Sequence, residues 1–254
     1  MKILRVEGLA KEFGGVHAVE DLNFALDAGR IHSIIGPNGA GKTTLFNLVS
    51  GVYTPTRGRI FFADRDVTGL APAQRARLGL ARTFQNLQIF FNMSALENVM
   101  VGRHRHLDCR LLPSMLHLPA IVRSDRGARD KAAELMRFVG LESYIGADAD
   151  AMPYGALKRL EIARALAAEP RLLLLDEPAA GLNPAETREI DELIKRVAAA
   201  GTTVVLVEHD MKLVMGISDH IVVLDYGRRL AEGTAAEVRA NPDVVRAYLG
   251  ASAA

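Results

Sequence analysis

A glycine-rich loop between two apolar segments constrains the fold of this chain more than any other feature. The apolar run Ile31–Ile35 leads directly into the pattern Gly-x-x-x-x-Gly-Lys-Thr, and apolar residues at helical spacing follow it. A strand, a glycine loop and a helix in this order are typical of a site whose backbone N–H groups surround phosphate oxygens at the positive end of a helix. We call this segment the phosphate loop, and its residues are Gly36, Pro37, Asn38, Gly39, Ala40, Gly41, Lys42 and Thr43.

Three side chains at the end of the phosphate loop are candidates for contacts with ATP and its metal ion. Lys42 is expected to neutralise the β and γ phosphates, and the hydroxyl of Thr43 is the expected Mg²⁺ ligand. Thr44 is expected to add a further phosphate contact. The alternative is a chance glycine-rich turn, and the strand before it and the helix after it argue against that alternative.

The later apolar runs predict a mostly parallel sheet. Residues 172–175 and Thr203–Val207 lack polar alternation, as expected of parallel strands with helices on both faces. Between them the sequence predicts an amphipathic helix, with Asn183 as its N-cap, Glu186 completing a capping box and Gly201 as its stop. This alternation of strand and helix predicts an α/β fold with right-handed crossovers.

Two other regions depart from this alternation. Short strands near residues 3–9 and 59–63 indicate an added antiparallel piece. The region between the phosphate loop and the later strands is rich in helices, with Ser94 as the expected cap of one of them. We therefore predict a single domain over residues 1–254, in which 1–85 and 169–254 form the α/β core with the antiparallel piece and 86–168 form an inserted helical subdomain.

Polar residues that follow the two apolar strands are the candidates for the chemistry. Asp176 and Glu177 follow the first strand and His209 follows the second, and strand ends of this kind present ligand-binding loops. Asp176 is expected to bind Mg²⁺, and Glu177 is placed to orient and deprotonate the attacking water. His209 is expected to form a hydrogen bond with a γ-phosphate oxygen. Gln85 is a further candidate for contact with Mg²⁺ or the water. The alternatives are an acidic pair that caps the next helix, a surface histidine and a plain surface amide.

In chain order these segments resemble the nucleotide-binding domain of ABC transporters, and the resemblance extends over nearly the whole chain. It implies a P-loop NTPase fold of the RecA-like type and a head-to-tail pair of ATPase domains. Each ATP would lie between the phosphate loop of one domain and the signature helix of the other, to which Tyr154 and Gly155 belong. The resemblance also implies that Phe13 stacks on adenine, the alternative being a packed turn residue.

Four longer segments narrow the resemblance to the LivG-type ATPases of branched-chain amino acid importers. That family implies ATP and Mg²⁺ as cofactors and a place at the cytoplasmic face of the cell membrane. It also implies a second ABC ATPase subunit, identical or related, two transmembrane permease subunits and a solute-binding protein. The segments that carry this narrower resemblance are residues 82–85, 176–184, 208–215 and 241–250.

One segment departs from the family pattern. The ABC signature usually reads Leu-Ser-Gly-Gly-Gln, whereas this chain has Met152, Pro153, Tyr154, Gly155 and Ala156 in its place. The serine hydroxyl that would meet the partner's γ phosphate is absent. Because a hydrogen bond to a charged group is worth about 1.5 to 3 kcal/mol, we expect this contact to be weaker than usual.

Charge and hydropathy bear on the partners. The 31 Lys and Arg residues balance 30 Asp and Glu residues, which disfavours nucleic acid as a partner. No window approaches the ~20 apolar residues of a membrane-spanning helix.

The rival hypotheses for the function are a soluble ABC ATPase outside transport and a transporter of another cargo such as urea or amides. Four apolar residues after Gln85 are expected either to receive a permease helix or to join the ordinary core: Leu87, Ile89, Phe90 and Phe91.

Overall fold

The computed structural model describes residues 1–104 and 119–251 of the chain, which form two compact units. The first unit contains both sheets and combines residues from the two ends of the chain, 1–82 and 171–251. The second unit is helical and covers Thr83–Pro170. We call them the sheet unit and the helical unit. The chain therefore leaves the sheet unit after Arg82 and returns to it at Arg171.

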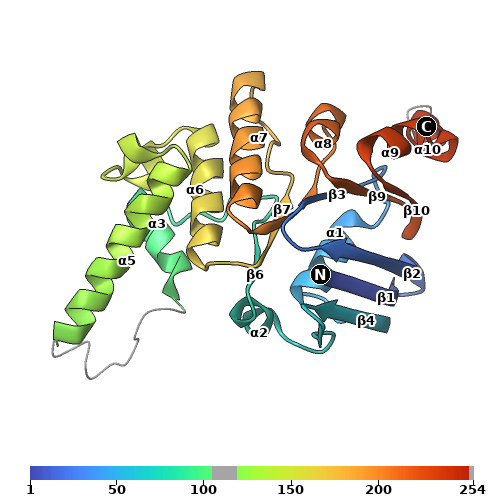
Figure 1. Ribbon diagram of the computed structural model, residues 1–254, viewed down its shortest axis with the longest axis horizontal. Helices are drawn as coiled ribbons and strands as arrows, with labels where there is room; N and C mark the ends of the chain where they lie inside the picture. The colour runs from blue at the N-terminus through green and yellow to red at the C-terminus, as the bar shows by residue number, and fades with distance from the viewer. Residues whose placement is uncertain (105–118, 252–254) are drawn as a thin grey trace. The chain divides into compact units, whose positions relative to one another are not determined.

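A six-stranded sheet forms the centre of the sheet unit (Figure 1). Its strand order is β10-β9-β3-β8-β7-β6, and all neighbours are parallel except β10, which pairs antiparallel with β9 at one edge. Parallel pairing brings the carboxyl ends of β3, β7 and β8 to the same edge of the sheet. The strands are β3 (Ile31–Ile35), β6 (Leu80–Arg82), β7 (Leu172–Asp176), β8 (Thr203–Val207), β9 (His220–Asp225) and β10 (Arg228–Gly233).

Successive residues of the central strands face two separate cores. Ile34 packs in a cluster with residues of α1 (Lys42–Ser50), and its neighbour Ile35 packs in another with residues of α8 and α9. This alternation follows from the two-residue period of a strand. Figure 1 shows α7 and α8 on the face opposite α1. The helices of this unit are α1, α2 (Pro72–Arg77), α7 (Pro184–Ala199), α8 (Met211–Ile217), α9 (Ala235–Ala240) and α10 (Pro242–Ala251).

A four-stranded antiparallel sheet covers the other side of α1. Its order is β2-β1-β4-β5, and its apolar face joins the same core cluster as Leu45 and Phe46 of α1. The helix after the phosphate loop is therefore buried between two sheets, and this packing fixes the position of the helix to which the loop is joined. The strands are β1 (Lys2–Phe13), β2 (Val16–Asp27), β4 (Arg57–Phe62) and β5 (Arg65–Asp66).

The predicted cap of α7 is confirmed. The Asn183 side chain accepts hydrogen bonds from the N–H groups of Ala185 and Glu186 at 2.9 and 3.0 Å, and the Glu186 carboxylate accepts from the N–H of Asn183 at 3.0 Å. Both halves of the capping box are thus formed. The apolar stripe of the helix is buried, as its periodicity predicts, through Ile190, Leu193, Ile194 and Val197.

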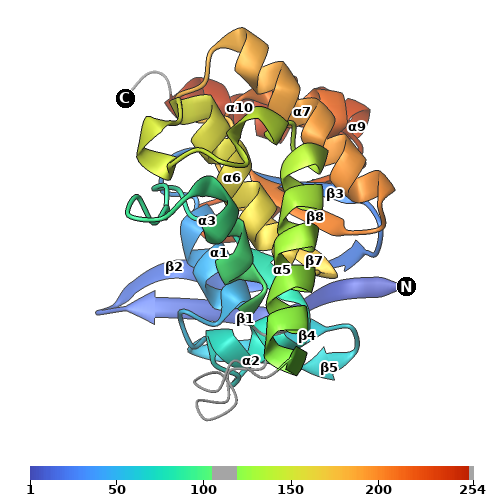
Figure 2. The same ribbon diagram turned by 90° about the vertical axis from the view of Figure 1, so that its left-hand side faces the viewer.

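Three helices make up most of the helical unit (Figure 2). Ser94 caps the first of them, as predicted, by accepting a hydrogen bond from the N–H of Glu97. Gly102 allows two helices to approach closely, because a Cβ atom there would lie 2.0 Å from the carbonyl oxygen of Arg164. The elements are α3 (Ala95–Gly102), α5 (Pro119–Phe138) and α6 (Tyr154–Ala167), with short 3₁₀ turns at Glu142–Tyr144 and Ala149–Ala151.

The sequence patterns leave five strands of the sheet unit unpredicted, namely β2, β5, β6, β9 and β10. β10 contains Arg228, Arg229, Glu232 and Gly233, so it carries no apolar alternation, as is common for an edge strand. Among the described residues no helix is both long and apolar enough to cross a membrane.

Candidate nucleotide-binding site

Two glycines of the phosphate loop stand where no side chain fits. A Cβ atom on Gly36 would lie 2.2 Å from the carbonyl oxygen of Leu224, and one on Gly41 would lie 2.4 Å from that of Ala18. Gly41 also has φ of 95°, in the left-handed region that favours glycine. The backbone of the loop is thus pressed against β2 and the end of β9. This close packing fixes the curve of the loop around the space in which phosphates are expected.

The start of α1 presents backbone N–H groups without a side-chain cap. Gly41 is the N-cap residue, and no side chain accepts a hydrogen bond there. The first N–H groups of a helix have no partner inside it, so they remain available to an anion. Thr43 is exposed at this end of the helix and Thr44 is half-buried. These features suit a polyphosphate.

Lys42 folds its ammonium group back onto the loop. Its Nζ atom donates hydrogen bonds to the carbonyl oxygens of Gly36 at 2.6 Å and Pro37 at 2.9 Å. Burial lowers the pKa of Lys42, and the negative charge of Glu177 raises it in part. Lys42 and Glu177 therefore lie within electrostatic reach of each other.

The Asp176 carboxylate ends β7 and is almost fully buried. Its Oδ2 atom accepts a hydrogen bond from Nη2 of Arg82 at 2.8 Å. The other terminal nitrogen of Arg82 donates to Oδ1 of Asn47 at 2.6 Å and Oγ of Ser50 at 3.0 Å, both on α1. Asp176 is paired in register with Val207 of β8. The carboxylate is therefore held in a fixed orientation at the sheet edge.

Glu177 has a strained backbone. Its φ is 48°, in the left-handed region that residues with a side chain rarely adopt. The N–H of Glu177 donates to the carbonyl oxygen of Val207 at 2.9 Å, and its own carbonyl accepts from the N–H of Ala180 at 3.1 Å. Strain of this kind persists only where neighbouring contacts hold it, and it is common at functional sites.

His209 follows β8 and projects into solvent, since its side chain is 68% exposed. The acid before it, Glu208, is buried, and burial raises the pKa of its carboxyl group. Oε1 of Glu208 accepts from the N–H of Ala179 at 2.9 Å, and Oε2 accepts from the N–H of His209 at 3.1 Å. Glu208 thus ties the segment after Glu177 to the residue that carries the imidazole.

Sequence reasoning missed the parts that Arg82 and Glu208 play in this site. Arg82 and Glu208 lie within the segments 82–85 and 208–215 that carry the family resemblance. A signal for Glu208 exists, because a single acid at the end of an apolar strand is buried with the strand and needs backbone donors. Arg82 gives no such local signal, since its partners lie 35, 32 and 94 residues away in the chain.

Phe13 ends β1 in the antiparallel sheet and is partly exposed. Its ring meets Tyr53 edge to face at 5.3 Å, and the Lys11 ammonium lies 4.9 Å from its centroid. Stacking on adenine stays a prediction for this ring. Gln85, Tyr154 and Gly155 belong to the helical unit, and their contacts with nucleotide and metal ion also stay predictions.

The signature segment of the helical unit starts α6. Pro153 is its N-cap residue, with φ of −66° and no side-chain hydrogen bond, and its carbonyl accepts from the N–H of Ala156 at 3.0 Å. Tyr154 is partly exposed, and the Lys158 ammonium lies 5.8 Å from its ring centroid. Gly155 is buried. The helix therefore presents an uncapped N-terminus and one exposed aromatic ring.

The oxygen donors of the sheet unit fit Mg²⁺. This ion is usually held by one or two protein oxygens together with substrate phosphates, which suits the Asp176 carboxylate and the Thr43 hydroxyl. Within the described residues no group of three or more His, Cys, Asp or Glu side chains is arranged to hold a metal ion. The donor set thus favours an ion that enters with the nucleotide.

Comparison with known proteins places this site in a family. A family model described as ABC transporter matches residues 19–180, which is more than half of the chain. The chain belongs to the ATP-binding cassette family. A second model, described as Branched-chain amino acid ATP-binding cassette transporter, matches residues 228–254 of this cassette.

Individual relatives agree with this result. The cassette is 48% identical to the high-affinity branched-chain amino acid transport ATP-binding protein BraF of Pseudomonas aeruginosa, over 98% of each chain. Identity and coverage are the same for the corresponding protein LivG of Escherichia coli. A solved structure of an ATP-binding cassette of an ABC transporter, in its ADP conformation, has a TM-score of 0.86 at 32% identity and covers 98% of this chain and 99% of its own. The predicted fold class is confirmed, and the cassette is an ATPase of this family.

Proposed function

We propose that this cassette is the ATP-hydrolysing subunit of an importer for branched-chain amino acids, bound at the cytoplasmic face of the cell membrane. The observation that carries the chemistry is the strained position of Glu177, held by Val207 beside Asp176 and within electrostatic reach of Lys42. The cargo rests on relatives that are named as branched-chain amino acid transport proteins and match along 98% of the chain.

Different residues of the sheet unit bind the phosphates and the metal ion during hydrolysis. The backbone N–H groups from Gly36 to Thr44 bind the phosphates, and Lys42 turns from its two carbonyl partners toward the β and γ phosphates. Thr43 and Asp176 would hold Mg²⁺, and the ion would neutralise charge that develops on the phosphate oxygens. Gln85 adds a contact to the ion or the water from the helical unit.

Glu177 and His209 act on the reacting atoms themselves. The Glu177 carboxylate orients the attacking water and takes a proton from its oxygen. His209 donates a hydrogen bond to a γ-phosphate oxygen, and Glu208 fixes the backbone from which the imidazole projects. The exposed position of the imidazole leaves it accessible to a nucleotide. Phe13 stacks on the adenine.

The cassette works with a second cassette, identical or related. In that dimer, Tyr154 and Gly155 at the start of α6 face the nucleotide bound by the partner, and the whole chain of 1–254 acts as one ATPase domain. The uncapped helix end supports this proposal, since its backbone N–H groups offer contacts to an anion.

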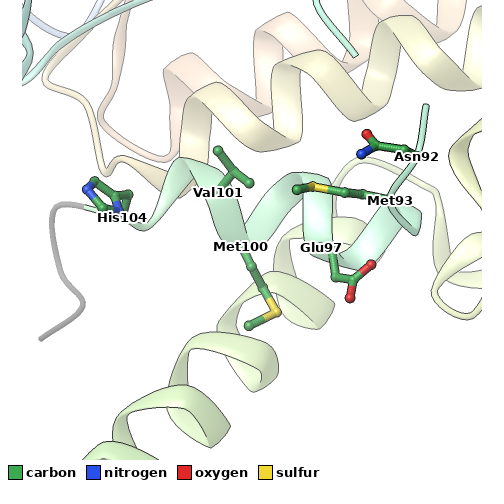
Figure 3. A pocket seen from close by; sticks show the side chains of 6 residues that line it. All are labelled: Asn92, Met93, Glu97, Met100, Val101 and His104. Atoms are coloured by element: carbon green, nitrogen blue, oxygen red, sulfur yellow. The ribbon is translucent and has the colours of Figure 1, made fainter. Parts of the chain in front are cut away.

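The helical unit offers a surface for the permease subunits. Phe90 and Phe91 are exposed, so they do not belong to the ordinary core. A pocket of about 440 Å³ lies on the same unit (Figure 3). Exposed apolar side chains and a pocket on one unit suit an amphipathic helix of a partner. The pocket is lined by Asn92, Met93, Glu97, Met100, Val101 and His104.

Uptake by the reconstituted transporter tests the proposed function. The cassette is expressed with hydrophobic permease subunits of the branched-chain amino acid type, and the purified complex is placed in vesicles with ATP. We expect ATP-dependent uptake of radioactive leucine and none of urea. Isolation of the cassette with RNA or DNA alone would refute transport, and uptake of urea or an amide without leucine would refute the cargo.

A further inference from the structure

Arg82 has a set of contacts that the proposed hydrolysis does not explain. Its guanidinium is nearly buried and bridges three acceptors on two elements: Asp176 at the end of β7, and Asn47 and Ser50 in the last turns of α1. The same group lies 5.6 Å from the ring centroid of Phe46. A single side chain thus connects the helix that follows the phosphate loop to the acid that ends the neighbouring strand.

We propose that Arg82 is a positioning residue that orients the Asp176 carboxylate for Mg²⁺ and links it to the point where the chain enters the helical unit. This inference rests on the proposed role of Asp176 as a metal ligand. Arg82 itself touches neither the nucleotide nor the ion in this proposal.

The energetics favour a role in orientation over one in stability. Both partners are buried, with 7% of the Arg82 side chain and 3% of the Asp176 side chain exposed. A buried ion pair seldom gains more from attraction than it loses in desolvation, and its clearest effect is to specify one geometry. The planar guanidinium reaches three acceptors in fixed directions, which a lysine ammonium does not reproduce.

The position of Arg82 in the chain gives the link to the helical unit. Arg82 is the last residue of β6 and of the sheet unit, and Thr83 is the first residue of the helical unit. Gln85, the proposed contact to the ion or water, comes three residues after Arg82. The residue that holds Asp176 is therefore also the last residue of the sheet unit before the chain enters the helical unit.

Binding of a non-hydrolysable ATP analogue, measured by calorimetry on the full chain, tests the proposal. The readout is the gain in affinity when EDTA is replaced by Mg²⁺. For Arg82→Lys we expect this gain to fall by about tenfold, because the carboxylate loses its fixed direction, while affinity in EDTA stays within about twofold. A purely structural role would lower both affinities together, and that result would overturn the proposal.

Arg75→Lys is the matched control. Arg75, on α2, is another buried arginine that contacts the end of α1, and its hydrogen bonds go to backbone oxygens and not to Asp176. We expect this variant to lose thermal stability and to keep the full Mg²⁺ gain. If Arg82→Lys does not fold, Asn47→Ala replaces it, since it removes one anchor of the guanidinium and leaves the Asp176 pair. An unchanged Mg²⁺ gain in that variant would also overturn the proposal.

Asp176→Asn separates the two hypotheses. If this variant keeps the Mg²⁺ gain, the proposed metal role of Asp176 is wrong. If it loses the gain while Arg82→Lys keeps it, the metal role stands and the role of Arg82 is wrong.

Discussion

Nη1 of Arg75 lies 2.6 Å from the carbonyl oxygen of Leu48 in the last turn of α1. The same nitrogen donates to the carbonyl of Val49 at 2.7 Å, and the rest of the guanidinium donates to the carbonyls of Leu70 and Thr68 at 3.0 Å. Only 1% of Arg75 is exposed. A cation at the C-terminal end of a helix also opposes the negative end of its dipole. Arg75 therefore stabilises the helix that carries the phosphate loop.

Replacing Arg75 with methionine should destabilise the protein strongly. The change keeps much of the side-chain volume and removes the guanidinium donor from four carbonyl oxygens, two of them in buried contacts, so we expect a loss of about 3 kcal/mol in the free energy of unfolding. Urea denaturation measures this loss. Arg77→Met is the control, since Arg77 is an exposed residue of the same helix, α2. Equal losses in the two variants would contradict the role of Arg75.

Acid should destabilise the sheet unit through His32. His32 is buried in β3 with Nε2 2.8 Å from the carbonyl oxygen of Asp27, and burial, aided by the charge of His220, lowers its pKa below 6.5, while Asp219 and Asp27 raise it in part. As pH falls below 6.5, the unfolded chain takes up a proton before the folded one does, so stability falls through the lowered folded pKa. Above pH 6.5 this contribution is fully present.

The expected slope is at most about 1.4 kcal/mol per pH unit for one proton. Urea midpoints between pH 7.5 and 5.0 measure it for the parent protein and for His32→Gln, which removes the titrating group and retains a donor for Asp27. The difference between the two proteins should appear only below pH 6.5. Parallel curves would show that His32 does not titrate in this range.

The parts of this cassette that sequence predicts are those whose cause is local. The capping boxes at Ser94 and Asn183 need two residues that are three positions apart, and the phosphate loop needs glycines within a stretch of six residues. Continuous apolar runs likewise predict parallel strands, and this prediction does not depend on the position of distant segments. Each of these features is complete within one short segment, so pattern alone identifies it.

The unpredicted parts depend on contacts between distant segments. Arg75 sits in a helix whose other residues are exposed, and only the fold shows that it reaches α1. The strain at Glu177 likewise comes from its contact with Val207, 30 residues later. Hydropathy patterns carry no information on such pairs. A buried arginine is therefore indistinguishable in sequence from an exposed one.

Glu177→Gln should retain nucleotide and nearly stop turnover. The amide keeps the shape and the backbone contacts of the site, and it removes the base, for which we expect a loss of about 100-fold or more in the hydrolysis rate. Phosphate release by the reconstituted transporter measures turnover, and calorimetry measures ATP binding. Glu192→Gln on the exposed face of α7 serves as the control. Hydrolysis by Glu177→Gln at the parent rate would refute the assignment of the base.

Pro153→Ser should strengthen the contact between the signature segment and the nucleotide of the partner. Pro153 has the extended backbone of an N-cap, with ψ of 156°, and offers no side-chain oxygen to α6. A serine there accepts a hydrogen bond from the helix, worth about 1 kcal/mol, and restores a hydroxyl toward the partner's nucleotide. We expect greater thermal stability, tighter ATP-driven dimerisation and faster hydrolysis in the assembled transporter. Pro153→Ala separates the effects, because it frees the backbone without adding the hydroxyl. If alanine and serine give the same dimerisation and rate, the missing hydroxyl does not limit closure, and the departure from the family pattern has no cost in this cassette.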